Sequence, residues 1–202
     1  MTFPLERPAR LAVFASGRGT NLRSLLAAFP VSDPLAHIVL ALSNKTDAGA
    51  LALARHHGVP AYAVAFGRDR DGFEREAQRL LGEFGVDLVC LAGFMRVLSP
   101  AFAQRYAGRL LNIHPSLLPA FPGLHAQRQA LAAGARESGC TVHFVDAGVD
   151  TGEVIVQRRV PVLPGDSEGA LAERILAEEH LAYPEAVRRV LTGQLAGYAV
   201  AR

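Results

Sequence analysis

Leu11-Ala-Val-Phe-Ala-Ser-Gly-Arg-Gly-Thr-Asn21 is the stretch that decides the fold class. It opens with the apolar run Leu11–Ala15, which predicts a buried strand, and passes through a glycine-rich turn. A helical pattern then runs from about Asn21 to Ala28. A strand that turns directly into a helix is the repeating unit of α/β folds. This stretch therefore predicts an α/β fold.

Short β-type runs and helical patterns keep alternating through the first two-thirds of the chain. Gly58 follows the second helical pattern and can terminate it. This alternation predicts a doubly wound, mostly parallel sheet of the Rossmann-like type. The expected strands are Ile38–Leu42, Tyr62–Val64 and Leu88–Ala92, and the expected helices are about Ala48–His57 and Gly72–Phe84.

The pattern changes after Gly93. Pro115, Pro119 and Pro122 interrupt the chain directly after a strand, and each proline ring fixes φ, so the loop that carries them is rigid. Ligands bind at the carboxyl ends of strands in open α/β sheets, so this loop is well placed to line a site. The later runs are suited to antiparallel pairing. The expected elements are a short helix near Pro100–Tyr106, strands at Arg109–Ile113, Thr141–Val145 and Val154–Val162, and a closing helix at Ser167–Leu191 with a bend at Pro184.

The composition is that of a compact protein rather than a disordered or fibrous one, with 50% hydrophobic and 20% charged residues among 202. We expect one domain over residues 1–202. The 21 basic and 19 acidic residues are spread along the chain, so the net charge of +2 does not indicate a nucleic-acid partner. No segment approaches transmembrane length. Cys90 and Cys140 lack metal or redox spacing and indicate buried thiols in a reducing compartment, so we expect a cytoplasmic protein.

The glycine-rich turn at Ser16–Asn21 can bind phosphate. Glycines expose backbone N–H groups, and a helix N-terminus adds partial positive charge. The dinucleotide fingerprint fails here, because Leu22 stands at the third glycine position and Ser43-Asn44-Lys45, not an acid, follows the second strand. An ordinary strand-to-helix turn, with Thr20 or Asn21 as the N-cap, is the alternative.

A second loop, Leu91-Ala-Gly-Phe-Met-Arg-Val-Leu98, follows the expected strand at Leu88–Ala92. Its apolar residues can form the wall of a pocket for a flat heteroaromatic ligand, with backbone groups reading the ligand's edge. Simple packing of the same residues is the alternative, and the sequence of the loop favours it.

Asn112, His114 and Asp150 are residue types that can surround one carbonyl group. An amide can polarise the oxygen, an imidazole can move a proton, and a carboxylate can hold that imidazole charged. Asn112 and His114 lie on the same side of their strand by alternation, and His143 on a later strand can face the same region. Asp150 lies in an Asp-Thr-Gly segment that is equally typical of a turn. We expect ordinary surface or core roles for His37, His56, His57, His125 and His180.

These motifs together resemble the folate-dependent formyltransferases, and among them the phosphoribosylglycinamide formyltransferases of purine synthesis. The resemblance extends over nearly the whole chain, from the Gly19-Thr-Asn21 loop to Glu179-His180 and Tyr183-Pro184. Asn112-x-His114 followed by Ser116-Leu-Leu-Pro119 is specific to folate-type formyl transfer. The resemblance implies a formyl transfer from 10-formyltetrahydrofolate to the amine of glycinamide ribonucleotide by direct attack, without a metal.

The same resemblance implies roles for individual residues. Asn112 would bind the formyl oxygen, a protonated His114 would stabilise the oxyanion and donate a proton to the folate nitrogen, and Asp150 would stabilise the charged imidazole and move protons through a water. Gly19, Thr20, Asn21 and Glu179 would bind the ribonucleotide, and Arg70, Met95, Arg96, Val97, Leu98 and Asn112 would bind the folate. Residues of about 1–100 would then form the ribonucleotide half and about 101–202 the catalytic and folate half.

The expected partners are therefore the two small molecules, with no nucleic acid and no membrane, for a monomer or homodimer. Asp146 stands where such relatives often carry threonine, and Leu176 where some carry a polar residue. A methionyl-tRNA formyltransferase would be expected to carry a further domain for its tRNA. A 10-formyltetrahydrofolate hydrolase, with water as acceptor, and a non-catalytic nucleotide-binding module are the alternative functions.

Overall fold

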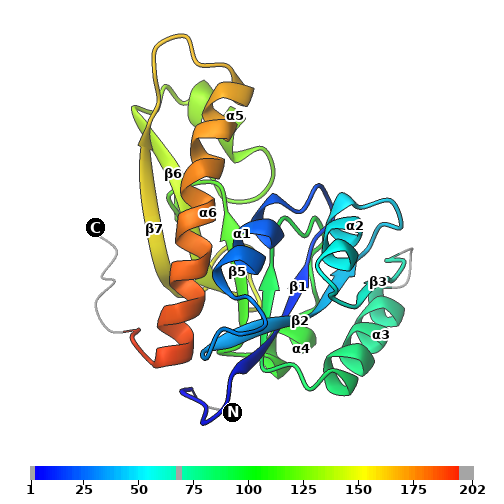
Figure 1. Cartoon of the computed structure of the whole chain (residues 1–202). Coiled ribbons are helices and arrows are strands. Elements are labelled where there is room, and N and C mark those ends of the chain that lie inside the picture. Colours follow the sequence, from blue (N-terminus) through cyan, green and yellow to red (C-terminus); the bar gives the residue numbers. More distant parts are fainter. Residues whose placement is uncertain (1–2, 67–69, 196–202) are drawn as a thin grey trace.

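The computed structural model describes residues 3–66 and 70–195, and its strands form one mixed sheet flanked by helices (Figure 1). The elements in chain order are β1 Ala9–Phe14, α1 Thr20–Ala28, β2 Ala36–Ser43, α2 Gly49–His56, β3 Ala61–Ala63, α3 Arg70–Glu83, β4 Leu88–Leu91, α4 Pro100–Arg105, β5 Leu110–His114, α5 Ala126–Ala132, β6 Glu137–Phe144, β7 Val154–Pro161 and α6 Glu168–Thr192.

The sheet has the strand order β3-β2-β1-β4-β5-β6-β7. The pairs from β3 to β5 are parallel, whereas β5 with β6 and β6 with β7 are antiparallel. Helices connect the parallel strands, and a loop without a helix connects β6 to β7, as antiparallel neighbours allow. The predicted fold class, a doubly wound and mostly parallel sheet with antiparallel strands toward the C-terminus, is confirmed.

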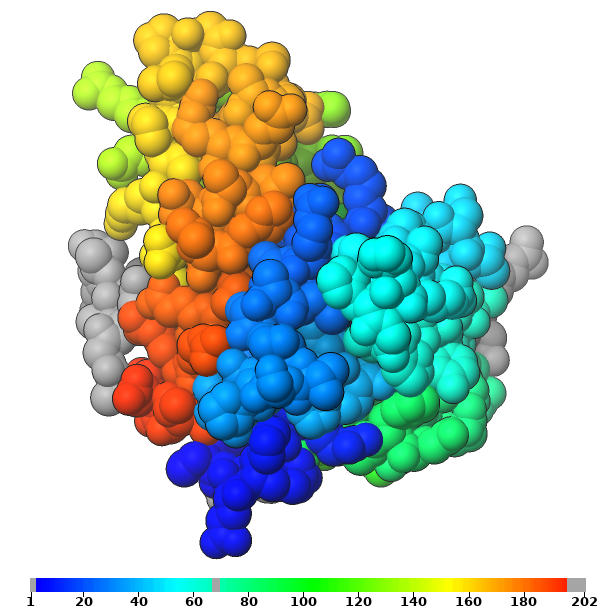
Figure 2. Space-filling view, viewed as in Figure 1, coloured from blue at the N-terminus to red at the C-terminus, as the bar shows by residue number. Residues whose placement is uncertain are grey.

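The two faces of the sheet carry separate hydrophobic clusters. In β1, Leu11 and Val13 belong to the cluster under α1, α2 and α6, while Ala12 and Phe14 belong to the cluster under α3 and α4. This alternation is the period of two that a strand imposes on its side chains. Burial on both faces explains why the run Leu11–Ala15 is continuously apolar. Seen from one side, α1, α2 and α6 form a continuous surface in front of the sheet (Figure 2).

The closing helix α6 crosses the β6–β7 end of the sheet and packs beside α1 (Figure 1). Ser167 caps its N-terminus by accepting a hydrogen bond from the Ala170 amide at 3.1 Å, and Gly193 ends it with φ 72°. The helix runs as one element through Pro184. The buried Tyr183 hydroxyl lies 2.9 Å from the carbonyl oxygen of Leu91 and 3.2 Å from that of Leu111. This side chain therefore joins α6 to β4 and β5 close to the ends where the site lies.

Two features differ from the sequence-based prediction. The helix α5 was not predicted, because its buried side chains include only the small Ala126 and Ala130, which give little hydrophobic contrast. The strand β6 begins at Glu137 rather than at the predicted Thr141. Its first residues pair with Arg159–Pro161 at the end of β7, and this pairing rather than an apolar run defines the strand there.

Candidate active site

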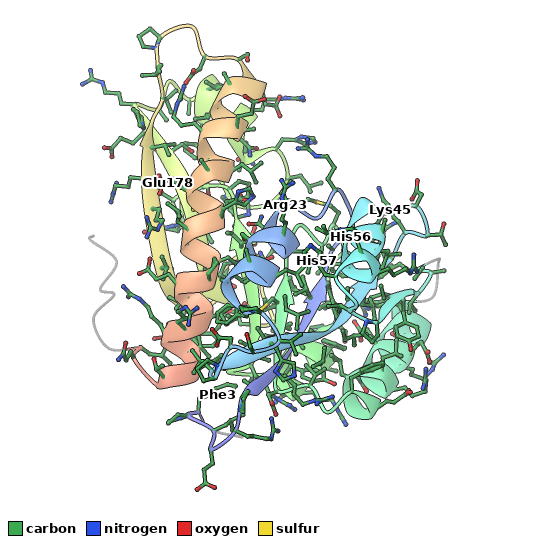
Figure 3. The ribbon with its side chains drawn as sticks, in the orientation of Figure 1. Phe3, Arg23, Lys45, His56, His57 and Glu178 are labelled. Atoms are coloured by element: carbon green, nitrogen blue, oxygen red, sulfur yellow. The ribbon has the colours of Figure 1, made fainter. Side chains whose placement is uncertain are left out.

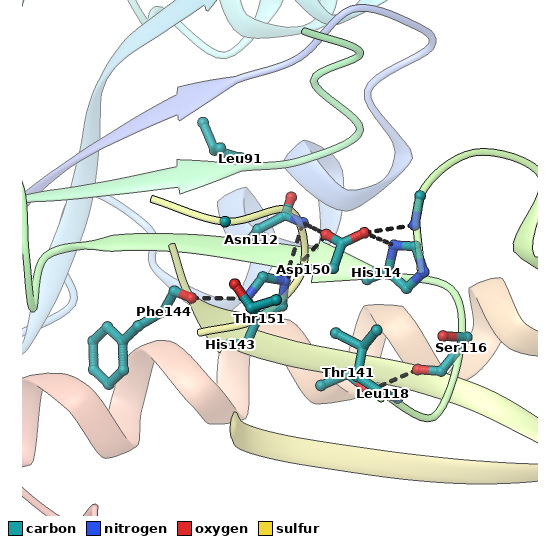
Figure 4. Close-up of polar contacts among 12 residues, drawn as sticks. Leu91, Asn112, His114, Ser116, Leu118, Thr141, His143, Phe144, Asp150 and Thr151 are labelled. Atoms are coloured by element: carbon teal, nitrogen blue, oxygen red, sulfur yellow. Dashed lines mark hydrogen bonds and ion pairs between the residues drawn. The ribbon is translucent and has the colours of Figure 1, made fainter. Parts of the chain in front are cut away.

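The candidate active site lies where the carboxyl ends of β1, β4 and β5 meet. These strands are parallel neighbours, so the loops that leave their ends converge on one edge of the sheet. The sheet register places Asn112 of β5 between Leu91 of β4 and His143 of β6. The loop between β6 and β7 carries Asp150 to this same edge (Figure 4).

Asp150 contacts both residues with which the sequence associated it. Its Oδ2 atom lies 3.3 Å from Nδ1 of His114, and its Oδ1 atom accepts a hydrogen bond from Nδ2 of Asn112 at 3.4 Å (Figure 4). The side chains of His114 and Asp150 are only 6% and 11% exposed, so bulk water screens their interaction weakly. The turn alternative for Asp150 does not exclude this contact, because the residue has φ 55° and its loop directs the carboxylate inward.

The charge of Asp150 is maintained by its neighbours. Burial acts to raise the pKa of Asp150, but the contact with His143, the hydrogen bond from the Gly123 amide and the charge of nearby His114 outweigh it and lower the pKa below its usual value. The Gly123 amide donates to Oδ2 at 2.8 Å. The carboxylate is therefore ionised at neutral pH.

Both ring nitrogens of His114 face acceptors. Nε2 lies 2.9 Å from the carbonyl oxygen of Phe121 in the proline-rich loop, and Nδ1 faces the Asp150 carboxylate. Only the doubly protonated imidazolium can donate to both at once. The contacts therefore suit a protonated His114, a group that can donate a proton and stabilise an oxyanion.

His143 completes the cluster. Its Nδ1 lies 2.7 Å from the carbonyl oxygen of Phe144, while Nε2 lies 3.2 Å from Nδ2 of Asn112 and 3.6 Å from Oδ1 of Asp150. The side chain is 2% exposed. His143 therefore orients the Asn112 amide. In the sequence, only the position of His143 on a later strand indicated that it could face this region.

The glycine-rich turn holds the N-terminus of α1 open to a ligand. Gly19 is the N-cap with φ 82°, and no side chain in the described part of the chain caps the helix there, so the alternative of a Thr20 or Asn21 cap is not what the structure adopts. A Cβ atom on Gly19 would lie 2.8 Å from Cα of Ala50 in α2. Both the backbone angle and the close approach of α2 therefore require glycine here. Arg23 in α1 and Lys45 after β2 lie at this same end of the molecule (Figure 3).

Asn21 and Glu179 meet beneath this turn although they are 158 positions apart in the chain. Nδ2 of Asn21 donates to Oε2 of Glu179 at 2.7 Å, and both side chains are buried. Burial raises the pKa of Glu179 against the opposing effect of this hydrogen bond. Oδ1 of Asn21 is buried and has no hydrogen-bond partner among residues 3–66 and 70–195.

The turn after β4 presents a mixed surface. Met95 and Val97 are 63% and 64% exposed, whereas Leu98 is 8% exposed and packs with the cluster under α3 and α4. The Arg96 guanidinium lies 5.2 Å from the centre of the Phe66 ring. Packing in the core thus explains the apolar side chain of Leu98, but not those of the exposed Met95 and Val97.

Arg70 lies at the start of α3, beside Glu74 at 4.0 Å. Glu74 is buried and accepts hydrogen bonds from the backbone and hydroxyl of Ser99, which follows Leu98 directly. A cavity of about 510 Å³ opens here, lined by Arg70, Asp71, Glu74, Arg75, Gln78, Ser99, Pro100 and Ala101. The structure therefore places Arg70 near the far end of the turn rather than among the catalytic residues.

The remaining chemistry-bearing groups have structural surroundings. Cys90 and Cys140 are free and buried, and burial is the main cause that raises the pKa of each thiol to about 12, so neither is a thiolate nucleophile. His56 and His57 are exposed and lie against each other at the end of α2 (Figure 3). Across residues 3–66 and 70–195 there is no group of three or more histidine, cysteine or acidic side chains that could hold a metal ion. Within the same part of the chain, no helix has the length and apolar character needed to cross a bilayer.

Several known proteins are similar in sequence to most of this chain. The sequence model of the formyl transferase family matches residues 9–187. The phosphoribosylglycinamide formyltransferase of Escherichia coli is 44% identical over 188 residues, covering 92% of this chain and 88% of that protein. The trifunctional purine biosynthetic protein adenosine-3 of Drosophila melanogaster is 49% identical over 192 residues, and this chain spans only 14% of its length.

A solved structure has the same fold. Glycinamide ribonucleotide transformylase 1 from Symbiobacterium toebii superposes with a TM-score of 0.88 at 45% identity, covering 96% of this chain and 93% of that one. The family match spans the strand that precedes the glycine-rich turn, the Asn112–His114–Asp150 cluster and most of α6. The chain therefore belongs to the formyl transferase family.

Proposed function

We propose that this protein transfers the formyl group of 10-formyltetrahydrofolate to the amine of glycinamide ribonucleotide in purine synthesis. The observation that carries the proposal is the buried Asp150 carboxylate in contact with both Asn112 and His114. The names of the Escherichia coli and Symbiobacterium toebii relatives support the same acceptor. The whole chain then acts as one catalytic domain, since residues from both of its halves contribute to the site.

The reaction begins when the amine nitrogen attacks the formyl carbon. A carbon–nitrogen bond forms, the electron pair of the carbonyl bond moves to oxygen, and donors at that oxygen lower the barrier. Asn112 supplies one donor, and the His114 imidazolium supplies the other when its Nε2–H exchanges the Phe121 carbonyl oxygen for the formyl oxygen, while Nδ1 keeps facing Asp150. Asp150, through a water, receives the proton that the amine loses. The electron pair on oxygen then reforms the carbonyl bond, and the bond to the folate nitrogen breaks as His114 gives that nitrogen a proton. No covalent intermediate on the protein is required.

The hydrogen bonds of Asn112 explain how its amide is oriented in the free protein and can still donate to the formyl oxygen. One side of Nδ2 is held by His143 at 3.2 Å, and the other reaches Asp150 at the longer distance of 3.4 Å. A formyl oxygen can take the place of the longer, weaker contact, while His143 keeps the amide oriented. The cluster thus holds a donor in place before the substrate arrives.

The phosphate of the ribonucleotide fits the N-terminus of α1. Gly19, Thr20 and Asn21 offer backbone N–H groups at the positive end of a helix, and no side chain caps that end. Exposed Arg23 and Lys45 add positive charge on the same side of the molecule (Figure 3). The Asn21–Glu179 pair then suits the hydroxyl groups of the sugar or the glycinamide part, since Oδ1 of Asn21 has no partner of its own among the described residues.

The folate fits the turn after β4. Met95 and Val97 offer exposed apolar side chains for the ring system, and the backbone of Arg96 and Leu98 offers polar groups to its edge. Arg70, 47% exposed at the far end of the turn, suits the acidic tail of the folate. The two free buried thiols agree with the reducing cytoplasm as the place of action.

The test is an assay of purified protein that follows the absorbance of the folate product with each acceptor in turn. Formyl transfer to glycinamide ribonucleotide is expected, and His114→Ala should abolish most of it. His56→Ala removes an exposed histidine from the end of α2 and serves as the matched control with a near-normal rate. Turnover with water or with charged tRNA, but not with glycinamide ribonucleotide, would replace the proposal by a hydrolase or a tRNA-directed enzyme.

A second measurement distinguishes an enzyme from a protein that only binds the ribonucleotide. A non-catalytic nucleotide-binding module would bind the ribonucleotide equally well with and without His114 and would release no tetrahydrofolate. Calorimetric titration of wild type and His114→Ala with glycinamide ribonucleotide, run beside the absorbance assay, distinguishes that module from an enzyme.

A further inference from the structure

Ser16 joins the phosphate turn to the turn after β4. Its side chain lies directly after β1 and the residue is 4% exposed. The hydroxyl oxygen accepts a hydrogen bond from the Met95 amide at 2.8 Å, and the hydroxyl hydrogen donates to Oδ1 of Asn44 at 2.6 Å. The Ser16 amide in turn donates to the Gly93 carbonyl oxygen at 3.0 Å. One residue thus contacts the loops that follow β1, β2 and β4.

The Asn44 contact decides which way the Ser16 hydroxyl points. A hydroxyl has a single hydrogen, and that of Ser16 is donated to the Asn44 amide oxygen. A lone pair of the Ser16 hydroxyl oxygen therefore accepts the hydrogen bond from the Met95 amide. Since Ser16 is almost fully buried, water cannot easily replace either bond. Asn44, in the Ser43-Asn44-Lys45 segment after β2, therefore orients Ser16, and Ser16 holds Met95.

The Met95 side chain depends on this contact for its position. Met95 is 63% exposed and belongs to a turn rather than a strand, so the described structure holds its backbone N–H through the Ser16 hydroxyl instead of a sheet bond. Losing that bond would free the exposed part of the turn, while Phe94 and Leu98 on either side stay buried in the core.

We propose that Ser16 is a positioning residue that fixes the Met95–Leu98 turn to the phosphate turn, so that occupation of one substrate site favours occupation of the other. The inference rests on the proposed function, because it takes Gly19–Asn21 as the ribonucleotide site and Met95–Leu98 as the folate site. A phosphate bound at the Ser16–Asn21 turn reduces the mobility of that turn and therefore of Ser16. The buried hydrogen bond between the Ser16 hydroxyl and the Met95 amide then reduces the mobility of Met95. Such coupling through shared ordering needs no movement of the fold.

The first test compares Ser16→Ala with Ser24→Ala in steady-state kinetics. The Ser24 hydroxyl donates to the Asn21 carbonyl oxygen at 2.8 Å in α1, so its removal deletes the same group nearby without touching Met95. For Ser16→Ala we expect the KM for the folate to rise about 10-fold, the loss of one buried hydrogen bond, with kcat changed less than about 3-fold. Because coupling is reciprocal, the KM for the ribonucleotide at saturating folate should rise too, by the factor of coupling that is lost. Ser24→Ala should leave the KM for the folate within about 2-fold of wild type.

The coupling itself is measured by binding. Tetrahydrofolate is titrated into each protein with and without saturating glycinamide ribonucleotide. Wild type should bind tetrahydrofolate more tightly in the presence of the ribonucleotide, and Ser16→Ala should lose most of that gain. Asn44→Ala, which leaves the hydroxyl but removes its acceptor, should lose part of it, and the double variant no more than Ser16→Ala alone.

Hydrogen exchange provides a readout that does not depend on catalysis. Exchange of the Met95 amide, followed by mass spectrometry of peptides that span it, should become about 10-fold faster in Ser16→Ala and stay unchanged in Ser24→Ala. Unchanged exchange at Met95 overturns the positioning role whether or not the protein transfers formyl groups. Faster exchange with an unchanged coupling ratio overturns the link between the two sites, and failure of wild type to use glycinamide ribonucleotide overturns the proposed function and the coupling with it.

Discussion

Replacing Asp150 by asparagine removes one negative charge from the site and preserves its shape. An amide oxygen placed at the Oδ2 position can still accept from the Gly123 amide at 2.8 Å, and the amide NH₂ group at the Oδ1 position can donate toward Nε2 of His143, 3.6 Å away. The variant loses the charged partner of His114 and, because an NH₂ group at the Oδ1 position cannot accept, the 3.4 Å hydrogen bond from Nδ2 of Asn112. The imidazolium then faces a neutral oxygen instead of a carboxylate.

The size of the effect follows from the burial and length of that contact. His114 and Asp150 lie 3.3 Å apart with side chains 6% and 11% exposed, so they form a buried ion pair, and we scale its contribution by that of a hydrogen bond to a charged group, about 1.5–3 kcal/mol. At about 1.4 kcal/mol per tenfold, this contact alone corresponds to a roughly 10- to 150-fold loss in rate. The proton route through Asp150 is lost as well, so we expect kcat to fall about 10²- to 10⁴-fold, the range for a positioned acid or base.

The assay is the absorbance of the folate product at saturating concentrations of both substrates, with thermal unfolding measured on the same samples. Both KM values should change little, because the loss falls on the transition state. Asp146→Asn is the control: this exposed carboxylate in the same loop accepts from the Gly148 amide at 3.0 Å and the Thr151 hydroxyl at 2.7 Å through Oδ1, and an amide oxygen can keep both bonds.

Two results would contradict a role for the Asp150 charge. An Asp150→Asn enzyme with a rate within about threefold of wild type would mean that the charge has no part in the rate-limiting chemistry. A large loss matched by Asp146→Asn, or by a comparable fall in the unfolding temperature of Asp150→Asn, would assign the effect to the loop's conformation instead of the charge.

Other substitutions test the remaining parts of the site. His114→Ala should lower kcat about 10²- to 10⁴-fold, and adding Asp150→Asn should cost less than about tenfold more, since the two residues act as a unit; equal further losses in the double variant would show independent roles. Gly19→Ala, with φ 82° and a methyl group 2.8 Å from the backbone of α2, should destabilise the fold by about 1–3 kcal/mol and weaken ribonucleotide binding, whereas Gly17→Ala, with open space around it, should do neither in calorimetry. Burial raises the pKa of Glu179, so its contribution to stability is complete below its unfolded pKa and is lost as the pH rises through the folded one. Glu179→Gln should therefore match the wild-type unfolding temperature near pH 4 and exceed it near pH 8, while its KM for the ribonucleotide rises; a difference that shrinks as pH rises would contradict this sign.

Local pattern in the sequence was enough for much of the fold. Continuous apolar runs such as Leu11–Ala15 and the spacing of apolar residues in α3 predicted where strands and helices follow one another along the chain. These patterns depend on backbone geometry and burial within one element. The helix α5 and the early start of β6 escaped, because small buried alanines and paired polar residues leave no such period. Alternation along one strand also placed Asn112 and His114 on the same side, and both reach Asp150.

Contacts between distant segments needed the tertiary structure. Asp150 reaches His114 because of its own left-handed backbone and the length of the β6–β7 loop, and neither is readable from an Asp-Thr-Gly segment. His143 meets Asn112 through the register of β5 with β6, and Ser16 meets Met95 because β1 and β4 are neighbours in the sheet. By itself the sequence determined which residue types and local elements this protein has, since these depend on neighbours along the chain. Only the packed sheet decided which of those residues share a hydrogen bond, because register and loop conformation depend on the whole fold.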